Sequence, residues 1–325
     1  MSPAFSLFPR SASTVAGQVD ALFFFLVGVS VFFAGLIFLL IIVFAIKYRR
    51  RSPDEQPKPI HGNLALELIW TIIPLGLTLV MFVWGAWLFV TLSKPPADAL
   101  EVYVVAKQWM WKYQHPEGKR EIGELHIPVG RPVTLTMTSE DVIHSFFIPA
   151  FRVKKDVLPG RYTTVWFQAT KVGEYQQYCT QYCGTGHAGM LSKIIVMEPA
   201  AYETWLRGSD STGPPASATA APAPVSLAAQ GEQLLGQLGC SSCHLPSGKG
   251  PGPSLSGVYG KPVKLTSGET ITADETYLRE HILTPGKKVV AGYPPIMPSF
   301  QGRISEDQLA QLIAYIKSLA SQAAK

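Results

Sequence analysis

Two long apolar runs dominate the first third of the chain. Residues 21–46 carry no charged side chain, and a second apolar run covers residues 68–92, with Pro74 near its start. At about 1.5 Å of rise per residue, a helix of either length can cross a hydrocarbon core about 30 Å thick. A signal peptide has an apolar core of only about 7–15 residues after a basic start, which does not fit the first run. The sequence therefore predicts a two-helix transmembrane hairpin over 21–95, preceded by a tail, 1–20.

Basic residues set the orientation of this hairpin. The first twenty residues carry only Arg10, whereas the connection between the two runs is rich in basic side chains. These are Lys47, Arg49, Arg50, Arg51 and Lys58. The positive-inside rule places the connection in the cytoplasm, so the tail and everything after about residue 95 lie outside.

Glu67 sits where the second run enters the membrane from the cytoplasm. Its position alone favours a carboxylate that reaches the interface, and the functional interpretation is an intramembrane proton site.

Apolar and polar residues alternate between positions 100 and 198, which indicates short strands. Two such faces are formed by Val102, Val104 and Ala106, and by Val133, Leu135 and Met137, with further strands expected at 164–169 and 194–197. Glycine and proline interrupt the strands at turns. The pattern predicts an all-β antiparallel sandwich or barrel over residues 96–207.

A cluster of soft metal ligands precedes the last of these strands. It contains Cys179, Cys183, His187 and Met190. Thiolate, imidazole and thioether together suit copper, whereas zinc rarely takes a thioether. His144, at another strand end, can supply a second imidazole, and two bridging thiolates with two imidazoles can hold two copper ions. The alternatives are a buried zinc site or a disulfide between the cysteines, which would leave the histidine and the methionine unexplained.

Residues 208–226 are mostly Ser, Thr, Gly, Pro and Ala, without apolar periodicity, and are typical of a semi-extended linker. The region after it, 227–325, contains Cys240-Ser-Ser-Cys243-His244, the attachment motif of a c-type haem. In this motif both thiols bond to the haem and the histidine is an axial iron ligand. A redox pair of the thioredoxin kind also uses Cys-x-x-Cys, but no βαβ pattern surrounds this one.

The haem iron needs a sixth ligand. Met297 is the only methionine after Met197, and Met/His ligation is usual for cytochromes c, so Met297 is the predicted ligand and His281 the alternative. Ser305 and Gln308 form a capping box that opens a last helix. Its apolar residues recur at helical spacing: Leu309, Leu312, Ile313, Ile316 and Leu319.

Composition excludes several classes of protein. Hydrophobic residues make up 47% of the chain and charged residues 16%, against about 25% in soluble proteins. The net charge of +5, from 28 basic and 23 acidic residues, includes no dense basic run, so a nucleic-acid partner is not expected. Because the four cysteines fall in two close pairs beside other ligands, they favour metal or cofactor chemistry over a disulfide framework.

Over residues 20–200 the chain resembles subunit II of haem–copper cytochrome c oxidases. The matching motifs are Cys179-x3-Cys183-x3-His187-x2-Met190, His144-Ser145-Phe146, Gln108-Trp109-Met110-Trp111 and Leu66-Glu67-x2-Trp70-Thr71-x2-Pro74. The resemblance implies a cupredoxin fold that holds the binuclear copper centre CuA. Its implied ligands are His144, Cys179, Cys183, His187, Met190 and the backbone carbonyl of Gln181.

The resemblance also implies roles for residues around the copper. Trp109 corresponds to the tryptophan of electron entry, and Glu67 to the glutamate at the entrance of a proton path into the catalytic subunit. Trp111 and Tyr113 either share the aromatic cluster of Trp109 or simply pack a strand. Gln181 stands where many members have a glutamate that helps to bind magnesium at the subunit I interface. An amide is a weaker ligand for a hard cation, so magnesium binding here is doubtful.

Residues 227–322 resemble an all-α class I cytochrome c. In the loop Gly252-Pro253-Ser254-Leu255, the Pro253 carbonyl is expected to orient His244. The fusion resembles the caa-type oxidases of bacteria. It implies a multi-pass protein of the plasma membrane with both redox domains on the outer side. Electrons would come from a cytochrome c or a quinol-oxidising complex, pass through haem c and CuA, and reach haem in subunit I for oxygen reduction with proton pumping.

Three rival functions fit the sequence less well. A quinol-oxidase subunit would lack the copper ligands, which are present here. A nitrous-oxide reductase would need a second, histidine-rich copper site, and the chain has only seven histidines. A membrane-anchored electron carrier or copper-delivery protein outside any oxidase would need neither Glu67 nor the cluster around Trp109.

Overall fold

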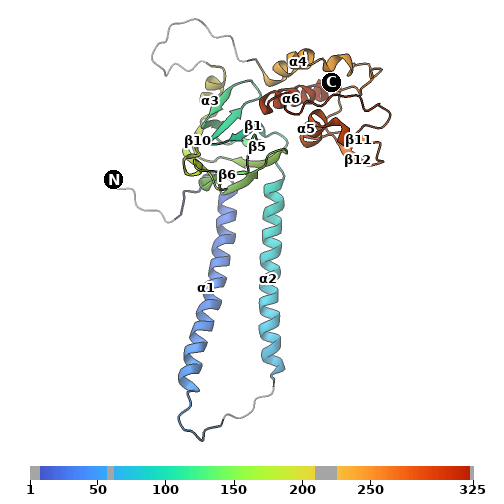
Figure 1. The fold of residues 1–325 in the computed structure, drawn as a ribbon. Coiled ribbons are helices and arrows are strands. Elements are labelled where there is room, and N and C mark those ends of the chain that lie inside the picture. The colour runs from blue at the N-terminus through green and yellow to red at the C-terminus, as the bar shows by residue number, and fades with distance from the viewer. Residues whose placement is uncertain (1–7, 57–61, 209–224, 323–325) are drawn as a thin grey trace. The chain divides into compact units, whose positions relative to one another are not determined.

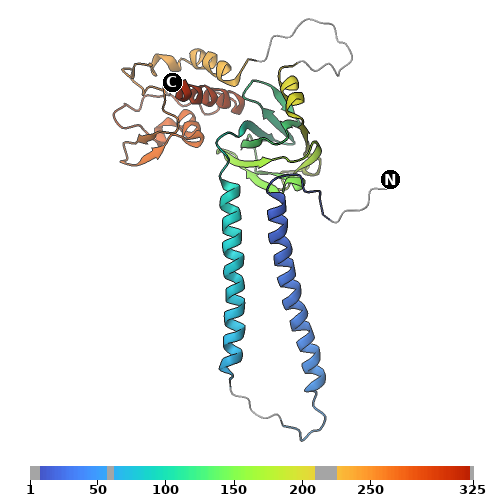
Figure 2. The same ribbon diagram turned by 180° about the vertical axis from the view of Figure 1, so that it is seen from behind.

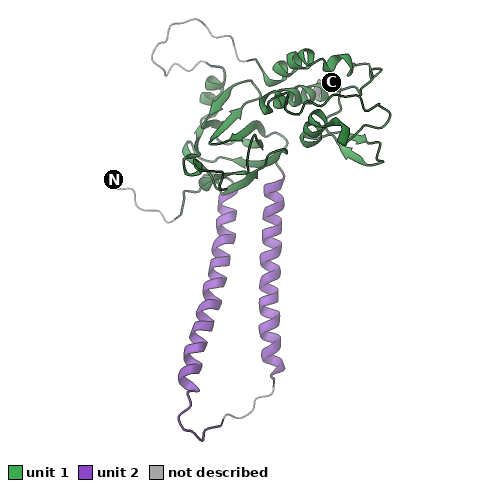
Figure 3. Cartoon of the chain, in the orientation of Figure 1, with its two compact units in different colours: residues 1–14, 95–325 green, residues 15–94 purple. Residues whose placement is uncertain are grey.

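The structure is a computed structural model that describes residues 8–56, 62–208 and 225–322. It forms two compact units, 15–94 and 1–14 with 95–325, which Figure 3 shows in different colours. Most of the predicted linker, 208–226, lies outside the described residues. Each unit is described by itself below.

The first unit is a pair of long apolar helices, α1 (Ala16–Lys47) and α2 (Leu64–Ser93), which run side by side in both views (Figures 1 and 2). Phe25 and Trp84 touch across the pair, with ring centroids 5.6 Å apart. Both helices are long and apolar enough to cross a membrane. Helix α1 begins inside the predicted tail, 1–20, because polar residues before the apolar run can stay helical beyond the hydrocarbon. Asn63 caps α2 by accepting a hydrogen bond from the backbone of Leu66.

The second unit begins with a sandwich of two five-stranded sheets. The first sheet has the order β3-β2-β1-β5-β8 and contains β1 (Leu100–Lys107), β2 (Met110–Gln114), β3 (Arg120–Ile122), β5 (Pro132–Ser139) and β8 (Thr163–Gln168). The second has the order β4-β10-β9-β6-β7 and contains β4 (Glu124–Pro128), β6 (His144–Ile148), β7 (Val153–Val157), β9 (Gly173–Cys179) and β10 (Leu191–Met197). Short helical turns η1 (Pro149–Phe151) and η2 (His187–Gly189) and helix α3 (Pro199–Leu206) complete this β-sandwich domain.

Aromatic contacts hold the two sheets together. The ring of Trp111 on β2 meets Phe146 on β6 edge to face, at 5.3 Å, and the Tyr113 hydroxyl donates to Ser192 on β10. The predicted inner face of β1, with Val102 and Val104, is fully buried. The predicted sandwich is confirmed, and most strand pairs are antiparallel as expected, but two pairs are not. Strand β1 pairs with β5, and β10 with β4, in parallel, because the chain crosses to the other sheet before it returns beside each partner.

The tail before α1 joins the β-sandwich domain. The backbone of Ala12 donates to the Ala150 carbonyl and accepts from Thr170, and Ser13 bridges to Ala169. Ala12 is fully buried. The described part of the tail is therefore an integral edge of the domain.

The C-terminal domain is mainly helical, which confirms the predicted fold class. Its elements are α4 (Leu227–Gln237), η3 (Cys240–Ser242), the hairpin of β11 (Pro262–Lys264) and β12 (Thr270–Thr272), α5 (Glu275–Leu283), η4 (Pro285–Lys287) and α6 (Glu306–Gln322). The predicted capping box is confirmed, since Ser305 Oγ accepts from the Gln308 backbone and the Gln308 side chain accepts from the Ser305 backbone. Figure 1 shows α6 beside α4. The apolar residues of α6 pack in a core with residues of α4 and α5.

Gly231 sets how closely α4 approaches α6. A Cβ atom there would lie 2.0 Å from the Gln311 carbonyl oxygen. Gly231→Ala is therefore expected to push the helices apart and to destabilise the C-terminal domain by about 1–3 kcal/mol, or several degrees in its thermal midpoint. Gly236→Ala, on the same helix, is the control, because a Cβ atom at this position would meet nothing within 4 Å. Calorimetry of the full chain tests this, and an equal gain in midpoint for both variants would contradict it.

Candidate metal and haem sites

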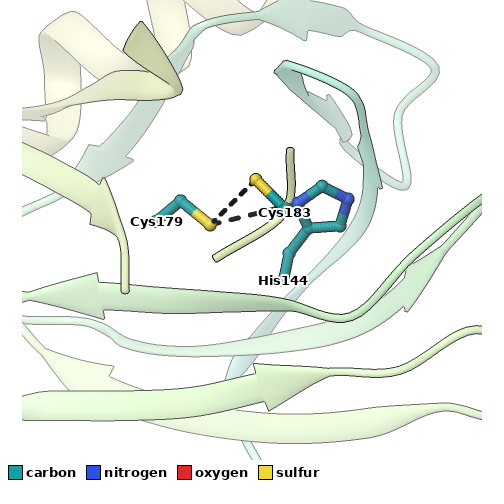
Figure 4. Close-up of side chains that lie close together, drawn as sticks. All are labelled: His144, Cys179 and Cys183. Atoms are coloured by element: carbon teal, nitrogen blue, oxygen red, sulfur yellow. Dashed lines mark hydrogen bonds between the residues drawn. The ribbon is translucent and has the colours of Figure 1, made fainter. Parts of the chain in front are cut away.

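Two sulfur atoms and an imidazole converge at one end of the β-sandwich domain (Figure 4). His144 opens β6 and Cys179 closes β9, while Cys183 follows in the loop between β9 and β10. The two Sγ atoms lie 3.8 Å apart, and Cys179 Sγ lies 3.9 Å from His144 Nδ1. All three residues are buried, and their ligand atoms lie within 4.8 Å of one another. The separation of the sulfur atoms leaves both cysteines as free thiols.

The same loop brings the other predicted ligands to Cys183. Its Sγ atom lies 3.5 Å from His187 Nδ1 and 3.8 Å from Met190 Sδ. The backbone carbonyl of Gln181 lies 3.3 Å from Cys179 Sγ. The other four atoms predicted as copper ligands thus surround the two thiol sulfurs. Thiolate, imidazole and thioether donors in this arrangement fit copper.

The pKa values of the two thiols are shifted in opposite directions. Burial by itself would raise the pKa of Cys179, but hydrogen bonds with His144 and the backbone at Ser145 and Gln181 lower it to about 6. Burial and the neighbouring Cys179 raise the pKa of Cys183. The first thiolate is therefore already present at neutral pH, and the second proton leaves when a metal binds, as in other thiolate sites.

Asp141 orients His144 and was missed by the sequence analysis. Its carboxylate lies 2.8 Å from His144 Nε2 and accepts from the Gln108 backbone. Because Nε2 is occupied in this way, Nδ1 faces the thiols, which is the tautomer a metal ligand requires. The signal was an acidic residue three positions before the histidine, which is too common a pattern to be noticed alone.

Trp109 lies over the ligand loop. Its indole nitrogen donates to the Cys183 carbonyl, at 3.2 Å, and its side chain keeps 40% of its surface exposed. Gly186 makes room for it, since a Cβ atom there would lie 2.4 Å from the indole ring. Trp111 and Tyr113 are instead fully buried between the sheets, with the Trp111 ring 6.0 Å from that of His144.

A cavity in the C-terminal domain gathers the predicted haem-binding residues. Cys240, Cys243, His244, Pro253 and Met297 all line it. The Pro253 carbonyl lies 2.7 Å from His244 Nδ1, so Nε2 remains for a metal. Gly252 lies against the same imidazole, with room for no Cβ atom. Two thiols, an oriented imidazole and a thioether around a mainly apolar cavity fit a covalently bound haem.

His281 lines the same cavity. Its Nδ1 atom is buried, and no residue that the structure describes contacts it as a hydrogen-bond partner. Burial and the nearby His244 lower the pKa of His281, so its ring is neutral and able to bind a metal. Its ring stacks on Tyr277, at 5.3 Å. The alternative sixth ligand is therefore at the cavity, as Met297 is.

Two further features bear on the predicted residues. Glu67 lies in the first turn of α2, in the helical unit.

A cluster of two histidines and a glutamate, which the sequence gave no reason to expect, lies between β2, β4 and α3. There the Glu121 carboxylate bonds to His115 and His126, and Trp205 stacks on His126 at 4.5 Å. These contacts lower the pKa of Glu121 against the effect of burial. They fix α3 to the sandwich, so the cluster is structural.

Comparison with known proteins bears on the family of the chain. Three family models match: "Cytochrome C oxidase subunit II, transmembrane domain" over residues 2–87, "Cytochrome C oxidase subunit II, periplasmic domain" over 120–198, and "Cytochrome c" over 228–320. The cytochrome c oxidase subunit 2 of Alkalihalophilus pseudofirmus is 32% identical over 86% of this chain and 82% of its own length. The quinol oxidase subunit 2 of Bacillus subtilis is 28% identical over 62% of this chain and 65% of its own.

A crystal structure of the periplasmic domain of subunit II of cytochrome oxidase from Bradyrhizobium japonicum is 33% identical, with a TM-score of 0.34. It covers 34% of this chain and 94% of that one. Two findings decide the family. One oxidase relative is similar over most of both chains, and the family models match both the transmembrane and the periplasmic parts of subunit II. This chain belongs to the cytochrome c oxidase subunit II family and carries a C-terminal cytochrome c domain.

Proposed function

We propose that this chain is the electron-input subunit of a caa-type cytochrome c oxidase. The observation that carries the proposal is the convergence of two ligand sets in one chain. Five side chains, including the two thiols, form the first set, and the second lines the cavity of the C-terminal domain. A binuclear CuA centre and a covalent haem c would each carry one electron at a time. The external donor, a cytochrome c or a quinol-oxidising complex, would be oxidised, and haem in subunit I would be reduced.

The residues supply binding and orientation for this transfer. His144, Cys179, Cys183, His187, Met190 and the Gln181 carbonyl would hold the copper ions. Four of these residues are buried, His144, Cys179, Cys183 and Met190, and ligands held on strands and a short loop are expected to move little between redox states, which favours fast transfer. Trp109, half-exposed and bonded to the Cys183 carbonyl, is the proposed point of electron exchange across the surface. Magnesium at the subunit I interface stays doubtful, because Gln181 offers a neutral amide.

The membrane anchor supports a place in a proton-pumping complex. The basic connection between the helices favours both redox domains on the outer side of a bacterial plasma membrane. Glu67, at the cytoplasmic start of α2, is the proposed entrance residue of a proton path into subunit I. Oxygen reduction itself, four electrons and four protons per molecule of oxygen, would take place in subunit I. Two spans are too few to house that site.

The copper centre is the part of the proposal that an experiment decides most directly. The oxidised full chain, purified in its complex and loaded with copper and haem, should give an electron paramagnetic resonance spectrum in which one electron is shared equally by two coppers. A large haem-bearing subunit should co-purify with it. A single-copper spectrum would overturn the CuA assignment. A chain that purifies alone with both cofactors would instead favour a membrane-anchored electron carrier or copper-delivery protein.

The sixth haem ligand is tested by a pair of variants. If Met297 binds the iron, Met297→Ala should lower the haem potential by on the order of a hundred millivolts, because thioether ligation raises it. His281→Ala should then leave the potential and the axial-ligand bands of the spectrum nearly unchanged. Redox titration with near-infrared magnetic circular dichroism measures both. The reverse result would make His281 the ligand.

A further inference from the structure

The outer face of β1 is covered, although it points away from the core of the sandwich. Tyr103 alternates with the inward Val102 and Val104, yet only 3% of it is exposed. Its ring packs against Leu227 of α4 and Ala310 of α6, so the C-terminal domain covers it. Figure 1 shows α6 beside β1.

A lysine joins carboxylates from both domains at this face. Lys317 Nζ on α6 lies 2.5 Å from Glu101 on β1 and 2.7 Å from Glu275 on α5. Its ammonium group also lies over the rings of Tyr103 and Tyr259. The three charged side chains are mostly buried, at 21–27% exposure. Although burial by itself opposes the charge, the two carboxylates raise the pKa of Lys317. Without the lysine, the two acidic groups would face and repel each other.

A second contact lies on another side of the interface. Tyr162, in the loop before β8, is 8% exposed and packs into the hydrophobic core of the C-terminal domain. The guanidinium of Arg279 lies over its ring, 5.3 Å from the centroid. Arg279 is itself held by both carboxylate oxygens of Glu306. Bidentate pairs of this kind fix the arginine in one orientation.

The third contact is made by the backbone that enters α4. The Leu227 amide donates to the Pro116 carbonyl, at 2.9 Å. Gly118, with φ of 98°, admits the Val225 carbonyl where a Cβ atom would be only 2.1 Å away. The C-terminal domain thus contacts the β-sandwich domain at β1, at the loop before β8 and at the chain around Pro116.

The proposed haem cavity lies away from the interface between the two domains. Its lining residues all come from the C-terminal domain, between Leu238 and Phe300. The β-sandwich domain therefore does not cover it.

We propose that the C-terminal domain is docked permanently on the outer face of β1, with Lys317 as the residue that locks it there. Resting on the proposed electron-input role, the domain would then receive electrons at its open cavity and pass them on from this fixed position. The C-terminal domain would not have to diffuse on its linker to reach the β-sandwich domain before each electron transfer. The interface is a docking surface within the chain, in addition to the two cofactor sites.

Hydroxyl-radical footprinting of the full chain in its complex, read by mass spectrometry, tests the docking. In the native chain, Tyr103 and Tyr162 should be oxidised severalfold more slowly than Tyr182, which is 72% exposed. Lys317→Met should raise the oxidation of Tyr103 severalfold, and Lys317→Arg should restore most of its protection. The control is Lys264→Met, at an exposed lysine of the same domain. Tyr113, inside the sandwich, should stay protected throughout and so reports an intact fold.

Either of two results would overturn the docking: native Tyr103 oxidised as fast as Tyr182, or Tyr103 equally protected with and without Lys317. The footprint depends on neither copper nor haem spectroscopy. The copper spectrum and the covalent haem, recorded on the same preparation, therefore test the proposed function separately.

Discussion

Cys183→Ser is expected to remove the proposed binuclear copper centre. The Cys183 Sγ atom lies within 3.8 Å of Cys179 Sγ, His187 Nδ1 and Met190 Sδ, so it contacts three of the other proposed ligands. A serine hydroxyl stays protonated at neutral pH and cannot bridge two soft ions. Copper content should fall below two per chain and the delocalised signal should vanish. Turnover with an external donor should fall by more than about 100-fold, since even residues that only orient ligands cost 10–100-fold.

Tyr182→Phe is the matched control for this variant. Tyr182 lies in the same loop, with its ring 5.8 Å from that of His187, but its side chain is largely exposed and is not among the proposed ligands. It should keep both coppers and nearly full turnover. Cys183→Ser that retains two coppers and a shared electron would contradict the assignment of this thiol.

His244→Ala is expected to stop electron entry through the C-terminal domain while leaving the copper signal intact. His244 is the imidazole that the Pro253 carbonyl fixes with Nε2 free, so its loss removes an axial ligand already oriented for iron. Cys240 and Cys243 remain, so the haem should stay covalently attached in the denatured chain. The optical spectrum should change, and turnover with the external donor should fall by about 100-fold or more.

The control for this variant lies in the same motif. Ser241→Ala changes an exposed residue between the two cysteines, and it should leave spectrum and turnover as in the native chain. If His244→Ala kept a native haem spectrum, another side chain would have to be the ligand, and His281 would be the first to examine.

Periodicity was sufficient for the fold where one face of an element is buried. The apolar runs predicted α1 and α2, and the alternation at Val102 and Val104 predicted β1. Alternation could not predict that Tyr103, on the opposite face, is also buried. That burial depends on Lys317 and Ala310, more than two hundred residues away, and no local pattern carries such a contact. The parallel pairing of β1 with β5 was missed for the same reason.

The proposed copper ligands could be named from the sequence because four of them lie in one short stretch with a rare combination of side chains, and the structure brings these side chains together. Residues that act through a ligand carry no such signal. Asp141 is an ordinary acidic residue until the fold places its carboxylate against His144. His281 could be proposed from the sequence, but its buried, unpartnered Nδ1 atom is known only from the packing around the cavity.

Each ligand set belongs to a single domain, and this has a consequence for how the protein matures. The proposed copper ligands lie between His144 and Met190, and the residues that line the proposed haem cavity lie between Leu238 and Phe300. Neither set borrows a side chain from the other domain. Copper insertion and haem attachment can therefore proceed in either order and by separate machineries. A cell starved of one cofactor should accumulate chains that are fully loaded with the other.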